Sequence, residues 1–292
     1  MFAAVESAYL VPASGKFRIK HAASQSPRDA PDKAQCKARL AECVEQLAAL
    51  QQVLYAHNRH AVLLVFQAMD AAGKDSTIRA VLSGVDPAGC QVYSFKRPND
   101  IELGHDFLWR TVQCLPQRGR IGVFNRSYYE EVLAVRVHPE FLGGQNLPYQ
   151  PKTLEELWQQ RLDSIRAHEQ HLARNGTVIL KFWLNVSPEE QRNRLLGRLD
   201  EPEKNWKFEE GDLAERAHWK DYMSAYEDAL NQTSRPWAPW YAIPADSKSY
   251  MRMIVAETLV RTLESLDLKY PSLAKSKRAK FGEFKQELLD EK

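Results

Sequence analysis

The chain alternates between amphipathic stretches and short, wholly apolar ones. Residues 31–57 are rich in helix formers, and their leucines and valines recur every three or four positions, which predicts an amphipathic helix. Residues 61–66 then form a solidly apolar run of the kind found in strands buried on both faces. A turn containing Gly73 follows, and residues 76–83 again have a helical pattern.

The same alternation continues along the rest of the chain. We predict further strands at 91–95, 120–124 and 177–186, and further helices at 101–113, 153–174 and from 187 onward. Strands that alternate with helices indicate an α/β fold, with a parallel β-sheet flanked by helices. Residues 1–31 lack any period and predict an irregular N-terminal arm, whereas the last residues are rich in charge.

Composition and charge exclude several classes of protein. The 292 residues are 44% apolar and 27% charged, so the chain is neither wholly disordered nor fibrous. Lysine and arginine (40) nearly balance aspartate and glutamate (38), which gives no global reason to expect nucleic acid or a membrane as partner. Four cysteines without C-x-x-C spacing, and no signal peptide or long apolar run, predict a soluble, cytoplasmic protein.

The first candidate for chemistry is the turn at residues 68–76, between the apolar strand and the helix after it. Backbone N–H groups at such a turn attract phosphate oxygens, and Lys74 would add a positive charge next to them. The segment departs from the phosphate-loop pattern G-x-x-x-x-G-K-[ST], because Ala68 replaces the first glycine and Asp75 the last Ser or Thr. The alternative is an ordinary connection with a surface lysine.

A second candidate follows the strand at 120–124. Asn125 and Arg126 come directly after it, and Glu130 lies about one helical turn further on, where a carboxylate could serve a magnesium ion that an asparagine alone would not hold. The alternative is that Glu130 and Glu131 are the solvated first turn of a helix.

A third candidate is the basic segment at 192–207, which follows a predicted helix start and contains a proline. Arginines on such a segment suit a lid that closes over phosphates, although a basic, solvated helix face is the more common explanation.

Together these segments resemble the polyphosphate kinase 2 family, and within it the class III type that acts on both nucleoside mono- and diphosphates. The resemblance spans about residues 40–270, in five matching segments: 67–75 (QAMDAAGKD), 105–110 (HDFLWR), 124–131 (FNRSYYEE), 200–208 (DEPEKNWKF) and 238–245 (APWYAIPA). It implies a thymidylate-kinase-like phosphate-loop fold with a helical lid. On this basis we expect a kinase domain at 32–270, with its lid at about 190–210, and a charged tail at 271–292.

The resemblance also implies roles for individual residues. Asp70 is expected to bind the metal and Lys74 the phosphates, while Arg126 clamps phosphate and Arg198 acts from the lid. Glu130 is expected to complete the metal site, because Asn125 stands where other classes of the family have aspartate. Other residues expected at the phosphate or nucleotide sites are Ala71, Ala72, Gly73, Asp75, Ser76, Lys96, Arg110, Arg136 and Arg194. For Lys96 a solvent-facing position, and for Arg110 a structural ion pair, are the alternatives.

The implied activity is reversible transfer of the terminal phosphoryl group of inorganic polyphosphate to AMP and ADP, giving ADP and ATP. It would use Mg²⁺, with Mn²⁺ as a substitute, and the enzyme is expected to be a homo-oligomer. Two alternatives stay open at this point. One is an ATP-dependent nucleoside monophosphate kinase, which should have a tight adenine pocket for its donor. The other is a non-catalytic sensor of nucleotides or polyanions, which the joint presence of Asp70, Lys74 and Glu130 disfavours.

Overall fold

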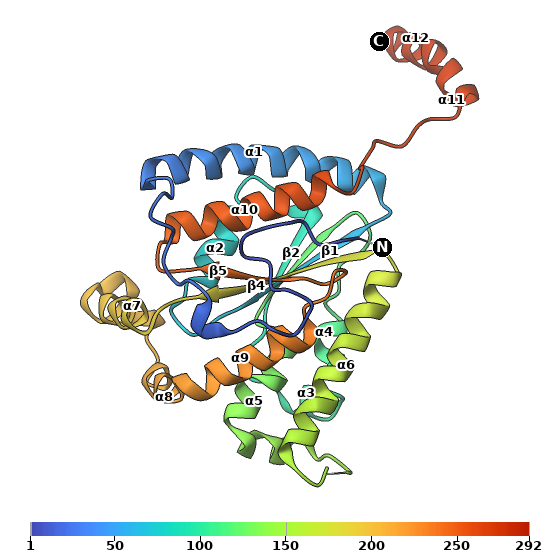
Figure 1. The fold of residues 1–292 in the computed structure, drawn as a ribbon. Coiled ribbons are helices and arrows are strands. Elements are labelled where there is room, and N and C mark those ends of the chain that lie inside the picture. The colour runs from blue at the N-terminus through green and yellow to red at the C-terminus, as the bar shows by residue number, and fades with distance from the viewer. Residues whose placement is uncertain (1, 150, 292) are drawn as a thin grey trace.

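Five parallel strands form the centre of the computed structural model, which describes residues 2–149 and 151–291 (Figure 1). Their order in the sheet is β2-β3-β1-β4-β5. The strands are β1 (Ala61–Gln67), β2 (Cys90–Ser94), β3 (Ile121–Asn125), β4 (Thr177–Asn185) and β5 (Trp240–Pro244).

The central strand is β1, and its seven residues are all buried because it pairs on both sides. Phe66 lies opposite Asn125 of β3 on one side and Phe182 of β4 on the other. The carboxyl ends of β1, β3 and β4 therefore meet at one edge of the sheet. In open parallel sheets this edge, where the strand order changes direction, is where ligands bind.

Helices cover both faces of the sheet (Figure 1). On one face α1 (Lys33–His57) packs on α10 (Lys248–Glu264), which also contacts α2 (Lys74–Val81). On the other face α6 (Leu154–Arg174) contacts β4 and α9 (Trp219–Thr233). The first of these helices begins at Lys33, two residues after the predicted start, because the Asp32 side chain caps it by accepting from the backbone N–H groups of Ala34 and Gln35.

A further helical segment projects from one end of the sheet (Figure 1). It consists of α7 (Pro188–Asp200), the 3₁₀ turn η5 (Pro202–Lys207) and α8 (Gly211–Ala217), and we call it the lid segment. The remaining short elements are α3 (Asp100–Leu103), α4 (Trp109–Val112), α5 (Ala134–Val137), η1 (Ile19–His21), η2 (Pro87–Gly89), η3 (Tyr128–Val132) and η4 (Pro139–Gln145).

The α/β class with a parallel sheet is confirmed, and each of the four predicted strands is present. The predicted helix at 101–113 is wrong, because it is two short helices, α3 and α4. Gly104 ends the first, and the Asp106 side chain accepts from the Leu108 N–H at 3.0 Å in the turn before the second. The fifth strand, β5, was not predicted from the sequence.

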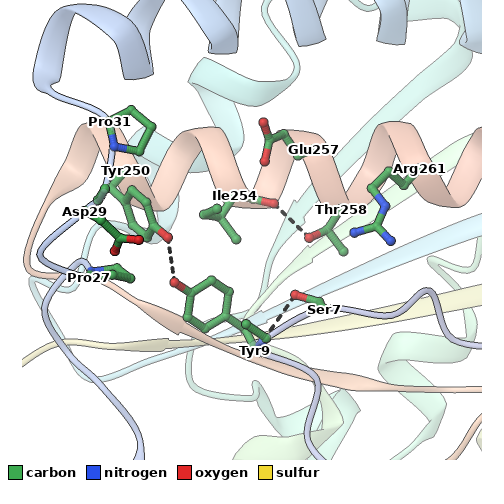
Figure 2. A pocket seen from close by; sticks show the side chains of 12 residues that line it. Ser7, Tyr9, Pro27, Asp29, Pro31, Tyr250, Ile254, Glu257, Thr258 and Arg261 are labelled. Carbon is green, nitrogen blue, oxygen red and sulfur yellow. Dashed lines mark hydrogen bonds between the residues drawn. The ribbon is translucent and has the colours of Figure 1, made fainter.

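The ends of the chain extend the fold. The N-terminal arm lies along β5, where the Val11 N–H donates to the Trp240 carbonyl at 2.9 Å and the Ala242 N–H to the Tyr9 carbonyl at 2.8 Å. A groove between this arm and α10 is bridged by the hydroxyls of Tyr9 and Tyr250, 2.6 Å apart (Figure 2). At the other end, α11 (Lys275–Ala279) and α12 (Phe281–Asp290) extend away from the sheet (Figure 1). Within the described residues no helix is long and apolar enough to span a membrane.

Candidate active site

The loop between β1 and α2 has the backbone of an anion-binding turn. Ala71 and Gly73 both have positive φ angles, 60° and 108°, so the chain reverses tightly before α2. The N–H groups in the first turn of α2, from Lys74 onward, have no acceptor within the helix and carry the positive end of its dipole. A side chain at Gly73 would be strained by its φ and would lie 3.3 Å from the Met251 methyl group. This backbone suits a phosphate group.

Lys74 points back into the loop. Its ammonium donates to the backbone carbonyls of Ala68, at 2.8 Å, and Met69, at 3.3 Å, and lies 3.9 Å from Asp70. Burial lowers the pKa of Lys74 to about 8, and the positive charge of Arg126 contributes to the same shift. The lysine is therefore held at the loop by weak neutral acceptors, and a phosphate anion would be a stronger partner.

Arg126 joins two carboxylates from different parts of the chain. It follows β3 with a φ of 61°, and its guanidinium forms ion pairs with Asp70 of the loop and with Glu130, the latter at 3.0 Å. Burial alone would raise the pKa of the Asp70 carboxyl, but Arg126 and Lys74 outweigh it and hold that pKa below its usual value. The Gln67 amide joins this cluster in the orientation that satisfies both of its polar atoms: its nitrogen then donates to the other carboxylate oxygen of Glu130 at 2.9 Å, and its oxygen accepts from the Ser127 backbone N–H at 3.1 Å.

Asn125 and Asp75 meet at the base of the loop. The Asn125 amide donates to the Asp75 carboxylate and, at 3.4 Å, to Ser94, while its own oxygen is buried and has no partner in the described chain. The Ser76 hydroxyl donates instead to the Gly73 carbonyl at 3.1 Å. Asp75 thus takes the position at which a phosphate loop ordinarily has Ser or Thr.

The side chains around the loop fit a hard divalent cation. Asp70, Asp75 and Glu130 are carboxylates, and the Asn125 oxygen is a neutral donor that lacks a hydrogen-bond partner. Oxygen ligands of this kind suit Mg²⁺ or Mn²⁺. No group of three or more His, Cys, Asp or Glu residues lies close enough to form a metal site in residues 2–149 and 151–291. Much of the coordination would thus come from phosphate oxygens and water.

The lid segment contributes two arginines in different ways. Arg198 donates to the Asp212 carboxylate at 2.9 Å and to the Lys207 carbonyl at 3.0 Å, so it is held within the lid segment with 21% of its side chain exposed. Arg194 is more buried and points to the loop, where it donates to the carbonyls of Ala71 and Ala72.

Three other predicted residues lie outside the cluster of Asp70, Lys74, Arg126 and Glu130. Arg110 donates to the Lys96 carbonyl at 2.8 Å and lies 3.5 Å from Glu102, which matches the structural alternative, and the Lys96 side chain is exposed. Arg136 is paired with Asp228 at 2.7 Å.

The structure also brings residues to the site that the sequence did not single out. A narrow pocket beside Asp70, Arg126 and Glu130 is completed by side chains from the lid segment and α9, namely Glu215, Tyr222 and Tyr226. The Tyr222 hydroxyl donates to Glu215. Gln67 also belongs to the site, and its position, as a polar residue that ends an apolar strand, could have been noticed in the sequence. Glu215, Tyr222 and Tyr226 lie in α8 and α9, which carry no distinct motif.

Comparisons with known proteins identify the family that this chain is similar to. Residues 30–271 match the family model described as "Polyphosphate kinase 2 (PPK2)". The chain is 58% identical to the ADP-polyphosphate phosphotransferase of Rhodopseudomonas palustris, over 84% of this chain and 85% of that one. It is 49% identical to the AMP/ADP-polyphosphate phosphotransferase of Meiothermus ruber, over 80% and 82%. The crystal structure of polyphosphate kinase 2 from Arthrobacter aurescens superimposes with a TM-score of 0.82 at 38% identity, covering 96% of this chain and 99% of that one.

Proposed function

This chain belongs to the polyphosphate kinase 2 family and is a polyphosphate-dependent nucleotide phosphotransferase, and on that premise we propose that it phosphorylates both AMP and ADP. The observation that carries the proposal is that Glu130 and Asp70 both pair with Arg126, next to a strand that ends in Asn125. Other classes of the family have aspartate at this position, and the class III type, which the sequence resembles, acts on both nucleotides. A relative at 49% identity is named for both acceptors, whereas one at 58% is named for ADP alone.

The proposed reaction needs little acid–base catalysis. The attacking atom is a phosphate oxygen of AMP or ADP, which is already anionic near neutral pH. One phosphoanhydride bond of polyphosphate breaks and another forms on the nucleotide. Because bonds of the same kind are exchanged, the reaction is expected to be reversible. The protein therefore acts mainly by positioning the two phosphate chains and by neutralising their charge.

Each residue of the cluster has a proposed part in this. The N–H groups of the loop and Lys74 hold the donor phosphates, and Arg126 and Arg198 neutralise the charge on the oxygens of the transferred group. Enzymes of the family generally use a divalent metal ion. We propose Mg²⁺, held by Asp70 and Glu130, with Mn²⁺ as a substitute; when bound, it would neutralise phosphate charge.

The assay that tests the proposal combines the protein with Mg²⁺, AMP and polyphosphate in the absence of ATP. Formation of ADP followed by ATP is expected. Phosphorylation of ADP with none of AMP, under the same conditions, would restrict the enzyme to ADP. Activity with ATP as the only donor and none with polyphosphate would instead support a nucleoside monophosphate kinase, and binding without turnover would support a sensor.

A further inference from the structure

Three successive carbonyl groups of the phosphate loop are bound from outside by helix α7. The Gln191 amide donates to the Asp70 carbonyl at 3.0 Å, and one nitrogen of Arg194 donates to the carbonyls of Ala71, at 3.3 Å, and Ala72, at 2.6 Å. In a planar trans peptide the C=O of one residue and the N–H of the next point in opposite directions. Fixing these carbonyls toward α7 therefore also fixes the direction of the N–H groups that follow them.

The N–H groups in question are those of the anion-binding turn. The N–H of Ala72 donates to the Met69 carbonyl at 3.3 Å, within the loop itself. The N–H groups of Ala71 and Gly73 follow the carbonyls of Asp70 and Ala72, so they are turned away from α7 and are the ones available to a phosphate. Ala71 reaches this geometry with a positive φ angle, which a residue with a side chain adopts only when its surroundings hold it there.

Arg194 has no donor left for a substrate. Its Nε donates to Glu190 at 2.8 Å, and its second terminal nitrogen to the carbonyls of Ala245, at 2.6 Å, and Asp246, at 3.0 Å. With the two bonds to the loop this accounts for all five N–H groups of a guanidinium. The sequence predicts that Arg194 binds phosphate; these contacts favour a different role, in which the arginine connects α7 to the loop and to the segment after β5.

Gln191 is held in an equally defined orientation. It is 1% exposed, and its amide oxygen accepts from Arg216 of α8 at 2.7 Å, which leaves its nitrogen directed at the Asp70 carbonyl. Arg216 also donates to the Pro188 carbonyl at the start of α7, at 2.7 Å. The buried Gln191 amide thus connects α8, through Arg216, to the Asp70 carbonyl of the loop.

We propose that Gln191 and Arg194 form a carbonyl clamp, a pair of positioning residues that set the phosphate loop in its anion-binding conformation from the base of the lid segment. The proposal rests on the proposed function, for which it names two residues that touch the loop but not the substrate. It predicts that losing either side chain weakens the binding of a phosphate chain even in the absence of nucleotide and turnover.

The test uses Arg194→Met and Gln191→Met, which keep the length of each side chain but remove its N–H groups. Arg174→Met, at the exposed end of α6, is the control for loss of one positive charge. Two quantities are measured: the Kd for inorganic tripolyphosphate by calorimetry, and the rate of amide hydrogen exchange in a peptide covering residues 68–76. We expect a Kd at least about tenfold higher in both clamp variants, the scale of one or two hydrogen bonds to an anion, and faster exchange confined to this peptide. The control should match the wild type.

Unchanged tripolyphosphate affinity in the folded variants would overturn the clamp. So would weaker binding with unchanged exchange at residues 68–76, because Arg194 would then act on the anion through its charge. If Arg194→Met fails to fold, Arg194→Lys decides: an ammonium keeps the charge but cannot reach four carbonyls, so the clamp predicts weakened binding, whereas a purely electrostatic role predicts binding close to wild type. A wild-type protein that binds tripolyphosphate but transfers no phosphoryl group would contradict the proposed function and leave the clamp standing.

Discussion

We expect Lys74 to give the enzyme a pH dependence whose sign and size follow from the surroundings of its ammonium group. In the free protein, burial and Arg126 lower the pKa of this lysine from 10.5 to about 8, against the opposing effects of Asp70, Glu130 and Asp75. A lowered pKa means that the ammonium loses its proton as the pH rises through about 8. If the ammonium must be charged to hold the donor phosphates, kcat/KM stays level below pH 7 and falls to about one tenth of that level at pH 9.

The value of kcat is expected to behave differently, because the bound phosphates restore the charge. The lowering of the pKa from 10.5 to about 8 means that the surroundings disfavour the charged lysine by about 3 kcal/mol, at 1.36 kcal/mol per pKa unit. One phosphate charge about 3 Å from the ammonium contributes about 5 kcal/mol at an effective dielectric constant of about 20. The attraction of the phosphate exceeds the free energy that lowers the pKa, so the pKa of Lys74 in the complex is expected to return to its ordinary range. We therefore expect kcat to stay level to about pH 9.

The measurement is a pair of pH profiles, of kcat/KM for polyphosphate and of kcat, between pH 6 and 10 at saturating Mg²⁺. Lys74→Arg is the decisive control, since a guanidinium does not titrate in this range; this variant should be slower but should lack the fall above pH 8. Lys181 is a second buried lysine with a pKa of about 8, so its titration could produce a similar fall. Because Lys74→Arg leaves Lys181 intact, a fall caused by Lys181 would persist in this variant. A fall that persists in Lys74→Arg would refute the reasoning.

Three further predictions concern the lid, the metal and the core. Arg198→Ala is expected to lower kcat by about 10²-fold, the scale of one charge donor in a transition state, with little change in Tm; an unchanged kcat would exclude this arginine from the reaction. Glu130→Gln should reduce activity and raise the Mg²⁺ concentration needed for half-maximal rate, and a wild-type Mg²⁺ titration would mean that Glu130 serves only its ion pair with Arg126. Lys181→Met should lower the free energy of unfolding by about 3–5 kcal/mol, because it leaves Glu169 charged and buried without its partner. Adding Glu169→Gln should recover part of that loss in urea titrations, and a second loss of equal size would contradict this account.

The features that the sequence predicted well are those decided by neighbours along the chain. The β1 run, the turn at Gly73 and the helix after it form one continuous segment, and a wholly apolar run next to a glycine turn has few other structures open to it. The order Asn125, Arg126, Glu130 after β3 is likewise local. These segments meet in the structure because parallel strands bring their carboxyl ends to one edge of the sheet.

The sequence could not predict which arginine contacts the phosphate loop and which is held within the lid segment. Arg194 and Arg198 are four residues apart on the same helix, and both belong to the basic stretch typical of a lid. What distinguishes them is that Arg194 meets carbonyls at positions 71, 72, 245 and 246, whereas Arg198 meets Asp212. These partners are set by the packing of distant segments. β5 escaped prediction for a related reason: it is five residues long and wholly buried, with no alternation to mark it.

The two tyrosines after Arg126 illustrate how distant packing supports local strain. Arg126 has a left-handed backbone conformation that costs free energy in a residue with a side chain. Tyr128 and Tyr129 both donate to the Glu169 carboxylate, at 3.0 and 2.9 Å, and Lys181 of β4 donates to the same carboxylate at 2.5 Å. The turn that carries Arg126 is thus tied to α6 and to the central sheet through a buried ion pair that no part of the proposed reaction uses. Because a strained conformation persists only when its surroundings over-determine it, we infer that this pair contributes to holding Arg126 between the two carboxylates of the site.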